Sequence, residues 1–192
     1  MLLPAADVDL AKSVIDRGRV AGFRLPEAGA YFVVTQDTAR NSRAAQFPPS
    51  GAIPARKLRV RTMKAPGLAD IHDIMIYLIG AVRVNQLDTL SFLPGALADH
   101  LTSSGGLLVN SSQMSSLRWL EAGATASYGT VSEPCNHPQK FPNGSLLLKH
   151  YVSGETALEA YWKSVAWPSQ GLFIGEPLAA PYCRSCAGSD AK

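Results

Sequence analysis

The sequence predicts one α/β domain, in which helices cover both faces of a mostly parallel sheet. Short apolar runs rich in β-formers alternate along the chain with segments of helical spacing. The chain has 192 residues, of which 46% are hydrophobic and 17% charged, and this describes a compact globule with a real core rather than a disordered chain. We assign residues 1–180 to this domain and residues 181–192 to a C-terminal tail.

Six segments are expected to be helical, from the helical spacing of apolar residues, from capping residues and from glycine or proline stops. They are residues 7–17, 38–46, 95–103, 113–122, 145–152 and a last segment from 155 or 156 to about 165. The clearest is 113–122, which Ser112 precedes and Gly123 ends. The first is expected to start at an Asp7 cap.

Five segments are expected to be strands: residues 30–35, the basic segment near Leu58, 73–79, 124–131 and 172–174. The first and third of these are continuous apolar runs, which is typical of strands buried on both faces. The stretch ATASYGTV at 124–131 has small side chains, so backbone or helices should approach it closely. Residues 84–94 are expected to form a loop.

The charge pattern, the length of the apolar runs and the absence of certain motifs exclude several function classes. The dense basic run is Arg56, Lys57, Arg59, Arg61 and Lys64. Within it Lys57, Arg59 and Arg61 alternate with apolar residues, which favours a half-buried strand with a solvated face over a patch for phosphate or an acidic partner. A formal net charge of +3 is too small to indicate nucleic-acid binding. No apolar run reaches the roughly 18–20 residues that a membrane span needs. Glycine-rich phosphate loops do not occur, and we expect no cofactor.

The sequence from Leu90 onward resembles the C-terminal half of an uncharacterised bacterial family found in species that carry the exosortase protein-sorting system. The residues that carry it are LSFLPGALADHLTSSGG, QMSSLRWLEAGATASYGTVSEPCNHPQKFPNG and GETALEAYWKSVAWPSQGLFIGEP, of which EPCNHPQKFP is the most specific. AKSVIDRG and VVTQDTARNSRAAQFP agree with the same family. The resemblance implies a role linked to the bacterial envelope or to exopolysaccharide.

The start of the chain bears on this resemblance. MLLPAADVDLAKS has neither the charged nor the apolar region of a signal peptide, and it opens directly on a helix pattern. We therefore expect an incomplete domain that lacks the N-terminal half of its relatives, whose full-length forms would be exported. Such a domain would expose a strand edge and an apolar face, which favours a homo-oligomer.

A second, more distant similarity is to gingipain-like peptidases of the caspase-like fold. The helix LRWLEAG before a small-residue strand, the signature in GETALEAYW and the final FIGEP, with Glu176 in place of Asp, follow the order of that family. The similarity implies a caspase-like sheet. In these peptidases a His-Gly ends one strand and a Cys ends the next. Residues 90–106 contain no cysteine, His72 precedes its strand and His100 precedes a leucine, so a non-catalytic binding or structural module is expected.

The alternative is a cysteine-dependent hydrolase that uses Cys135. A thiolate forms near neutral pH only beside an imidazole or a positive field, and His100 and His137 are the candidate bases. Glu133, two residues before the thiol, would be an acid with a shifted pKa if the fold buried it. Cys135 follows a predicted strand, where sites often lie in open α/β sheets.

Asp99 and His100 belong to a polar cluster with Thr102, Ser103 and Ser104 on the expected helix 95–103. The favoured interpretation is a capped helix end that faces solvent. The functional alternative is that the cluster forms the polar wall of a cleft.

Cys183 and Cys186 form a C-x-x-C near the C-terminus. The favoured interpretation is a tail without a role, with a disulfide or a zinc site completed by Cys135 and His137 as alternatives. Trp119 and Trp162 are expected to be core residues rather than ligand platforms.

Overall fold

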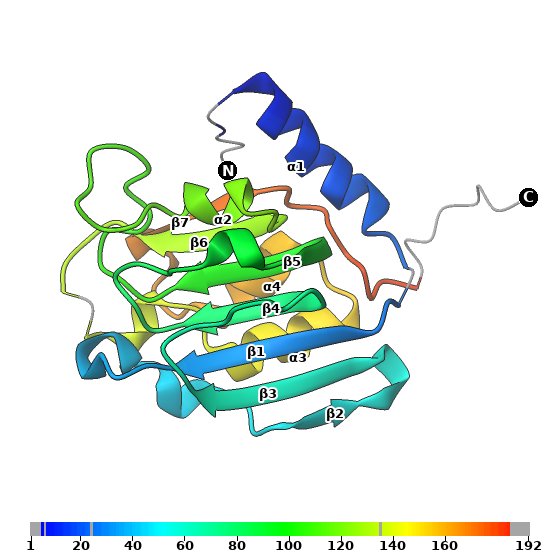
Figure 1. The fold of residues 1–192 in the computed structure, drawn as a ribbon, viewed down its shortest axis with the longest axis horizontal. Coiled ribbons are helices and arrows are strands. Elements are labelled where there is room, and N and C mark those ends of the chain that lie inside the picture. The colour runs from blue at the N-terminus through cyan, green and yellow to red at the C-terminus, as the bar shows by residue number, and fades with distance from the viewer. Residues whose placement is uncertain (1–4, 6, 24, 135, 185–192) are drawn as a thin grey trace, which may run out of the picture.

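The fold is built on a seven-stranded sheet with the strand order β2-β3-β1-β4-β5-β6-β7 (Figure 1). A computed structural model of the protein describes residues 5, 7–23, 25–134 and 136–184. The strands are β1 (Ala28–Val34), β2 (Gly51–Ile53), β3 (Leu58–Lys64), β4 (Ile74–Ile79), β5 (Phe92–His100), β6 (Ala126–Thr130) and β7 (Gly171–Gly175). Five central strands are parallel, and only the edge strands β2 and β7 are antiparallel to their neighbours. The predicted mostly parallel α/β sheet is confirmed.

Helices cover both faces of the sheet, as the sequence predicts (Figure 1). They are α1 (Val8–Val20), α2 (Leu117–Glu121), α3 (Gly144–Ser153) and α4 (Ala157–Ser164). α1 and α2 share one face, where Val14 and Leu120 pack together. α3 and α4 lie side by side on the other face. The helix starts follow from local chemistry: Asp7 and Asn143 each cap the first turn, and Thr156 forms a capping box with Glu159.

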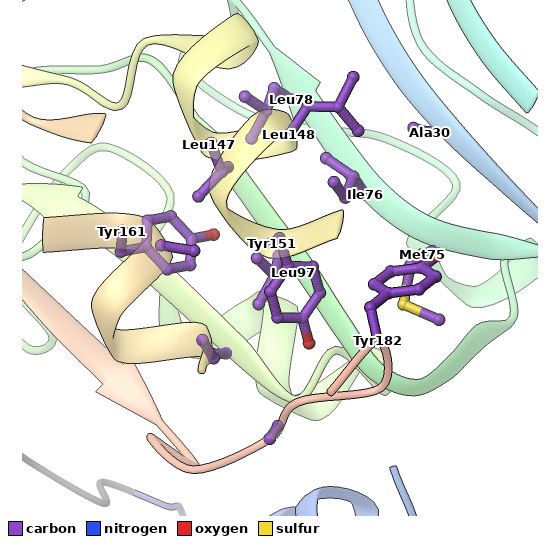
Figure 2. Packing of buried hydrophobic residues seen from close by; sticks show 14 of the residues in the cluster. Ala30, Met75, Ile76, Leu78, Leu97, Leu147, Leu148, Tyr151, Tyr161 and Tyr182 are labelled. Atoms are coloured by element: carbon purple, nitrogen blue, oxygen red, sulfur yellow. The ribbon is translucent and has the colours of Figure 1, made fainter. Parts of the chain in front are cut away.

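The larger core lies between the sheet and the α3–α4 pair (Figure 2). Leu147, Leu148 and Tyr151 of α3 face Ile76 and Leu97 of the sheet, and all five are buried. Tyr182, which lies beyond the last strand, also packs here, with its ring edge-on to Tyr151 at a centroid distance of 5.9 Å. The chain is therefore part of the packed body as far as Tyr182.

The expectation of a helix at 95–103 is wrong, because residues 95–100 belong to strand β5 (Phe92–His100). The strand is buried on both faces, so it has no polar–apolar alternation by which a sequence reveals a strand. Leu97 packs toward α3 and α4, whereas Ala98 packs toward α2. Pairing with β4 on one side and β6 on the other overrides the helix propensity of alanine and leucine.

Three further differences are smaller. Residues 38–46 form two short 3-10 turns, Thr38–Asn41 and Ala44–Gln46, instead of one helix. The helix expected at 113–122 shrinks to the five residues of α2. The edge strand β2 was not predicted; it spans only three residues and is largely exposed.

The order of the strands creates a reversal point in the sheet. From β1 the chain moves outward to β3, then returns to the other side of β1 to form β4, and continues in that direction to β5 and β6. In open parallel sheets, ligands bind at the carboxyl ends of the strands beside such a reversal. The fold therefore directs the search for a site to the carboxyl ends of β1 and β4.

Candidate functional site

A cavity of about 750 Å³ opens at this reversal point. Three segments line it, each at or just beyond the carboxyl end of a strand: residues 34–37 at the end of β1, 64–66 at the end of β3 and 81–83 just beyond β4. Its volume is within the range of about 300–1,000 Å³ that is typical of small-molecule sites. The carboxyl ends of three neighbouring parallel strands thus form one ligand-sized hollow.

Hydrogen bonds fix the wall of this carboxyl-edge cavity. The Thr35 hydroxyl donates to the carbonyl of Gly80 at 2.6 Å, which ties the end of β1 to the end of β4. The Asn41 amide donates to the Thr35 carbonyl at 2.7 Å and accepts from the Thr35 backbone N–H at 3.2 Å. A Cβ on Gly80 would lie 2.3 Å from the Arg40 carbonyl oxygen, so this crossing needs glycine. The wall is set before any ligand arrives.

The positive side chains around the cavity lack partners among the described residues, whereas the negative one is paired. Lys64 and Arg83 are exposed, and neither side chain makes a hydrogen bond or an ion pair within the part of the chain that the structure describes. The acidic side chain, Asp37, is already engaged: it accepts from the Arg40 backbone N–H and pairs with the Arg40 guanidinium at 3.3 Å. The cavity therefore carries two available cations beside a compensated carboxylate, which suits a carboxylate or phosphate group.

The predicted site residue Asp99 was expected on a helix end that faces solvent, and this expectation is wrong. Asp99 lies in a buried ion pair with Arg43. Both side chains are 1% exposed. Arg43 donates to the Asp99 carboxylate and, through the same nitrogen, to the Ile79 carbonyl. Burial raises the pKa of the Asp99 carboxyl, and the Arg43 guanidinium opposes that rise. The pair joins the segment after β1 to the ends of β4 and β5.

His100, the second predicted residue of this cluster, is also wholly enclosed. Its Nδ1 accepts from the Trp119 indole N–H at 3.0 Å, so its Nε2 carries the proton and donates to the Met114 carbonyl at 3.0 Å. Burial lowers the pKa of this imidazole to about 4. The ring is neutral at pH 7 and has no free nitrogen with which to take a proton from a thiol.

Gln113, which was not predicted as a site residue, connects Glu133 to the Thr102–Ser104 segment. The Gln113 side-chain carbonyl accepts from the Thr102 hydroxyl and from the Ser104 backbone N–H, both at 2.7 Å. Its amide nitrogen donates to Glu133 at 3.4 Å. Thr102 and Ser103 are buried, whereas Glu133 is exposed, so the fold does not bury this side chain as its predicted role would require.

The loop between β6 and α3 contains the remaining candidates. His137 is exposed, and its ring centroid lies 5.7 Å from that of Trp167. Lys140 is buried and donates to the carbonyls of Ser132 and Pro134, which holds the loop in shape. The predicted nucleophile Cys135 lies outside the described residues.

Of the two cysteines in the C-x-x-C, only Cys183 lies within the described residues. Cys183 is buried and disulfide-bonded, so it does not belong to a solvated tail, and Cys186 lies outside the described residues. Elsewhere, the described chain holds no group of three or more His, Cys, Asp and Glu side chains that could bind a metal ion. Its helices are also all too short or too polar to cross a bilayer.

Comparisons with protein-family models, with curated proteins and with solved structures find no match for this chain. Fold and site together define an α/β domain with a ligand-sized, cation-bearing cavity at the carboxyl ends of its parallel strands. Arg83 was not predicted as a site residue, and a phosphate patch was the less favoured interpretation of the basic run that includes Lys64. Lys64 is the last residue of that run and of β3, but only the fold places Arg83 beside it.

Proposed function

We propose that this domain is a binding module that holds an anionic group, a carboxylate or a phosphate, in the carboxyl-edge cavity. One observation carries the proposal: Lys64 and Arg83 line the same cavity from the ends of different strands, and neither has an acidic partner among the described residues. Such a pair attracts and orients an anion, because charge-assisted hydrogen bonds are about twice as strong as neutral ones.

The groups around the cavity favour binding over bond cleavage. The Thr35 hydroxyl is committed to the Gly80 carbonyl, and Asp37 is committed to Arg40. No histidine or cysteine is among the ten residues that line the hollow. A nucleophile needs a base within hydrogen-bond reach, and these lining residues supply no such pair.

A relationship to caspase-like peptidases, without their activity, is part of the proposal. Strand β5, which precedes α2, ends in Asp99-His100, where those peptidases are expected to carry their cysteine. The hydrolase alternative would depend on Cys135. Because both ring nitrogens of His100 are occupied, the exposed His137 is the base left to that alternative. A role linked to the bacterial envelope rests on the sequence resemblance alone.

Isothermal titration calorimetry with inorganic phosphate, citrate and galacturonate tests the binding proposal. We expect the double variant Lys64→Ala/Arg83→Ala to bind the preferred anion at least tenfold more weakly, because a hydrogen bond to a charged group contributes about 1.5–3 kcal/mol. Lys149→Ala is the matched control, since Lys149 is an exposed cation on α3 outside the cavity. Equal affinity in the double variant and the control, or no binding of any of the three anions, would contradict the proposal.

Labelling with a low concentration of iodoacetamide separates binding from hydrolysis. We expect Cys135→Ala to bind the preferred anion as the wild type does. Fast labelling that depends on Cys135 and slows in His137→Ala would instead favour the hydrolase, because it would reveal an imidazole-activated thiolate.

A further inference from the structure

A second, smaller hollow of about 170 Å³ lies on the α3–α4 side of the molecule and shares no lining residue with the carboxyl-edge cavity. It is lined by the turn Ala44–Gln46, the loop after β6, the start of α3 and the end of α4. Three amide side chains line it, Gln46, Gln139 and Asn143. We call it the amide hollow.

The polar groups of the amide hollow can form hydrogen bonds with a ligand, and the hollow carries little net charge. The side-chain oxygen of Gln46 is buried and has no hydrogen-bond partner within the described chain. The Asn143 oxygen caps α3 by accepting from the Leu146 N–H at 3.1 Å, which leaves its NH₂ group as a donor. Lys163 is paired with Glu155 at 2.9 Å, so its charge is compensated. The hollow thus presents hydrogen-bonding groups rather than a net charge.

Two half-exposed tryptophans flank the segment 163–166 that forms one side of the hollow. Trp162 is 47% exposed and Trp167 is 45% exposed, although the sequence predicted that Trp162 is a core residue. The Trp167 backbone N–H donates to the carbonyl of the lining residue Gln139 at 2.9 Å, which fixes the Trp167 backbone next to the hollow. Exposed indoles combine a large apolar face with one N–H donor and are typical of contact surfaces.

We infer that the amide hollow binds a pyranose ring, as part of a glycan. The hydroxyl groups of a sugar ring both donate and accept, as the amides require, and its C–H face stacks on an indole. The volume is below the lower limit of about 300 Å³ for drug-sized sites, so it suits a single ring. An apolar side chain from a protein partner would leave the buried Gln46 oxygen unsatisfied, which disfavours that occupant.

The three tryptophans make this inference directly testable by NMR. Each indole N–H gives one signal in a ¹⁵N–¹H spectrum, assigned with Trp162→Phe and Trp167→Phe. Trp119 is an internal reference, because it is fully buried and its N–H is bonded to His100. Titration with the methyl pyranosides of glucose, galactose, mannose and N-acetylglucosamine should shift the Trp167 signal saturably and leave that of Trp119 in place.

The variants separate this site from the anion site. Gln46→Ala should weaken the binding of the best pyranoside about threefold to tenfold, as the loss of one hydrogen bond implies. Leu178→Ala, which removes a side chain that is 73% exposed elsewhere, and Lys64→Ala/Arg83→Ala should leave that affinity unchanged. Absence of a saturable Trp167 or Trp162 shift with all four sugars, or a shift produced by benzyl alcohol and by none of the sugars, would overturn the inference.

Discussion

Two regions of the same sheet edge differ in whether their polar side chains are exposed and have partners within the chain. At the ends of β1, β3 and β4, Lys64 and Arg83 line a cavity, and their side chains have no partners among the described residues. At the end of β5, Asp99 and His100 are as polar but wholly buried, and each is bound by neighbours. The first region has the unused hydrogen-bonding capacity that a ligand needs, whereas the second uses its polar groups to hold the fold. Exposure and the lack of a charged partner therefore distinguish Lys64 and Arg83 from Asp99 and His100.

The largest effect should come from breaking the buried ion pair. Asp99→Ala leaves the Arg43 guanidinium buried without its carboxylate, and we expect the free energy of unfolding to fall by about 3–5 kcal/mol. Urea denaturation followed by circular dichroism measures this loss. Lys64→Ala, in the cavity, should change stability little. Comparable losses in the two variants would remove the contrast between the regions.

His100 should make stability depend on pH. Its folded-state pKa of about 4 lies below the unfolded value of 6.5, so the unfolded state binds the proton more readily. Stability should therefore decline as the pH falls from 6.5 towards 4, by about 3 kcal/mol in total. Urea denaturation of the wild type and of His100→Gln over this range isolates the contribution, because the other groups titrate in both. Parallel pH profiles would show that His100 is not a buried neutral imidazole.

The buried region should also resist added volume. Gly129 of β6 faces the backbone of Gly106, and a Cβ at 129 would lie 2.4 Å from the Gly106 nitrogen and 2.3 Å from the Ser116 hydroxyl. We expect Gly129→Ala to cost about 1–3 kcal/mol, measured by urea denaturation. Gly22→Ala is the matched control, because nothing lies within 4 Å of a Cβ there. A tolerated Gly129→Ala would mean that β6 and the 101–106 segment are loosely packed.

The smallest effect sharpens the description of the cavity wall. Thr35→Val removes the hydroxyl that donates to Gly80, and we expect a loss of about 1 kcal/mol in stability. Because this bond positions one wall, anion affinity should fall as well, although Thr35 supplies no charge. Calorimetry and urea denaturation of the same variant test both parts. Unchanged affinity would show that the wall forms without this bond.

The fold was largely predictable because its strands are apolar runs and its helices carry caps. The runs at β1 and β4 and the caps at Asp7 and Thr156 are local signals, and the structure places elements there. β5 was mistaken for a helix because burial on both faces leaves no alternation to read. The expected close approach to the small-residue strand is confirmed at Gly129 and Gly106.

The site was less predictable, because it depends on partners distant in sequence. Asp99 and His100 have the composition of a reactive cluster, and only the positions of Arg43 and Trp119 show that both are enclosed. Conversely, nothing in the sequence distinguishes Lys64 and Arg83 from other cations. They meet only because β3 and β4 end at the same edge of the sheet, on either side of β1. Nothing local to either residue indicates this meeting.

The most direct test of the anion site is a map of backbone amide shifts on titration with citrate. Binding at the carboxyl-edge cavity should move the signals of residues 35–37, 64–65 and 81–83 and spare those of α3 and α4. These shifts should disappear in Lys64→Ala/Arg83→Ala and persist in Lys149→Ala. Shifts confined to the loop between β6 and α3, or persisting in the double variant, would contradict the assignment of the anion site to this cavity.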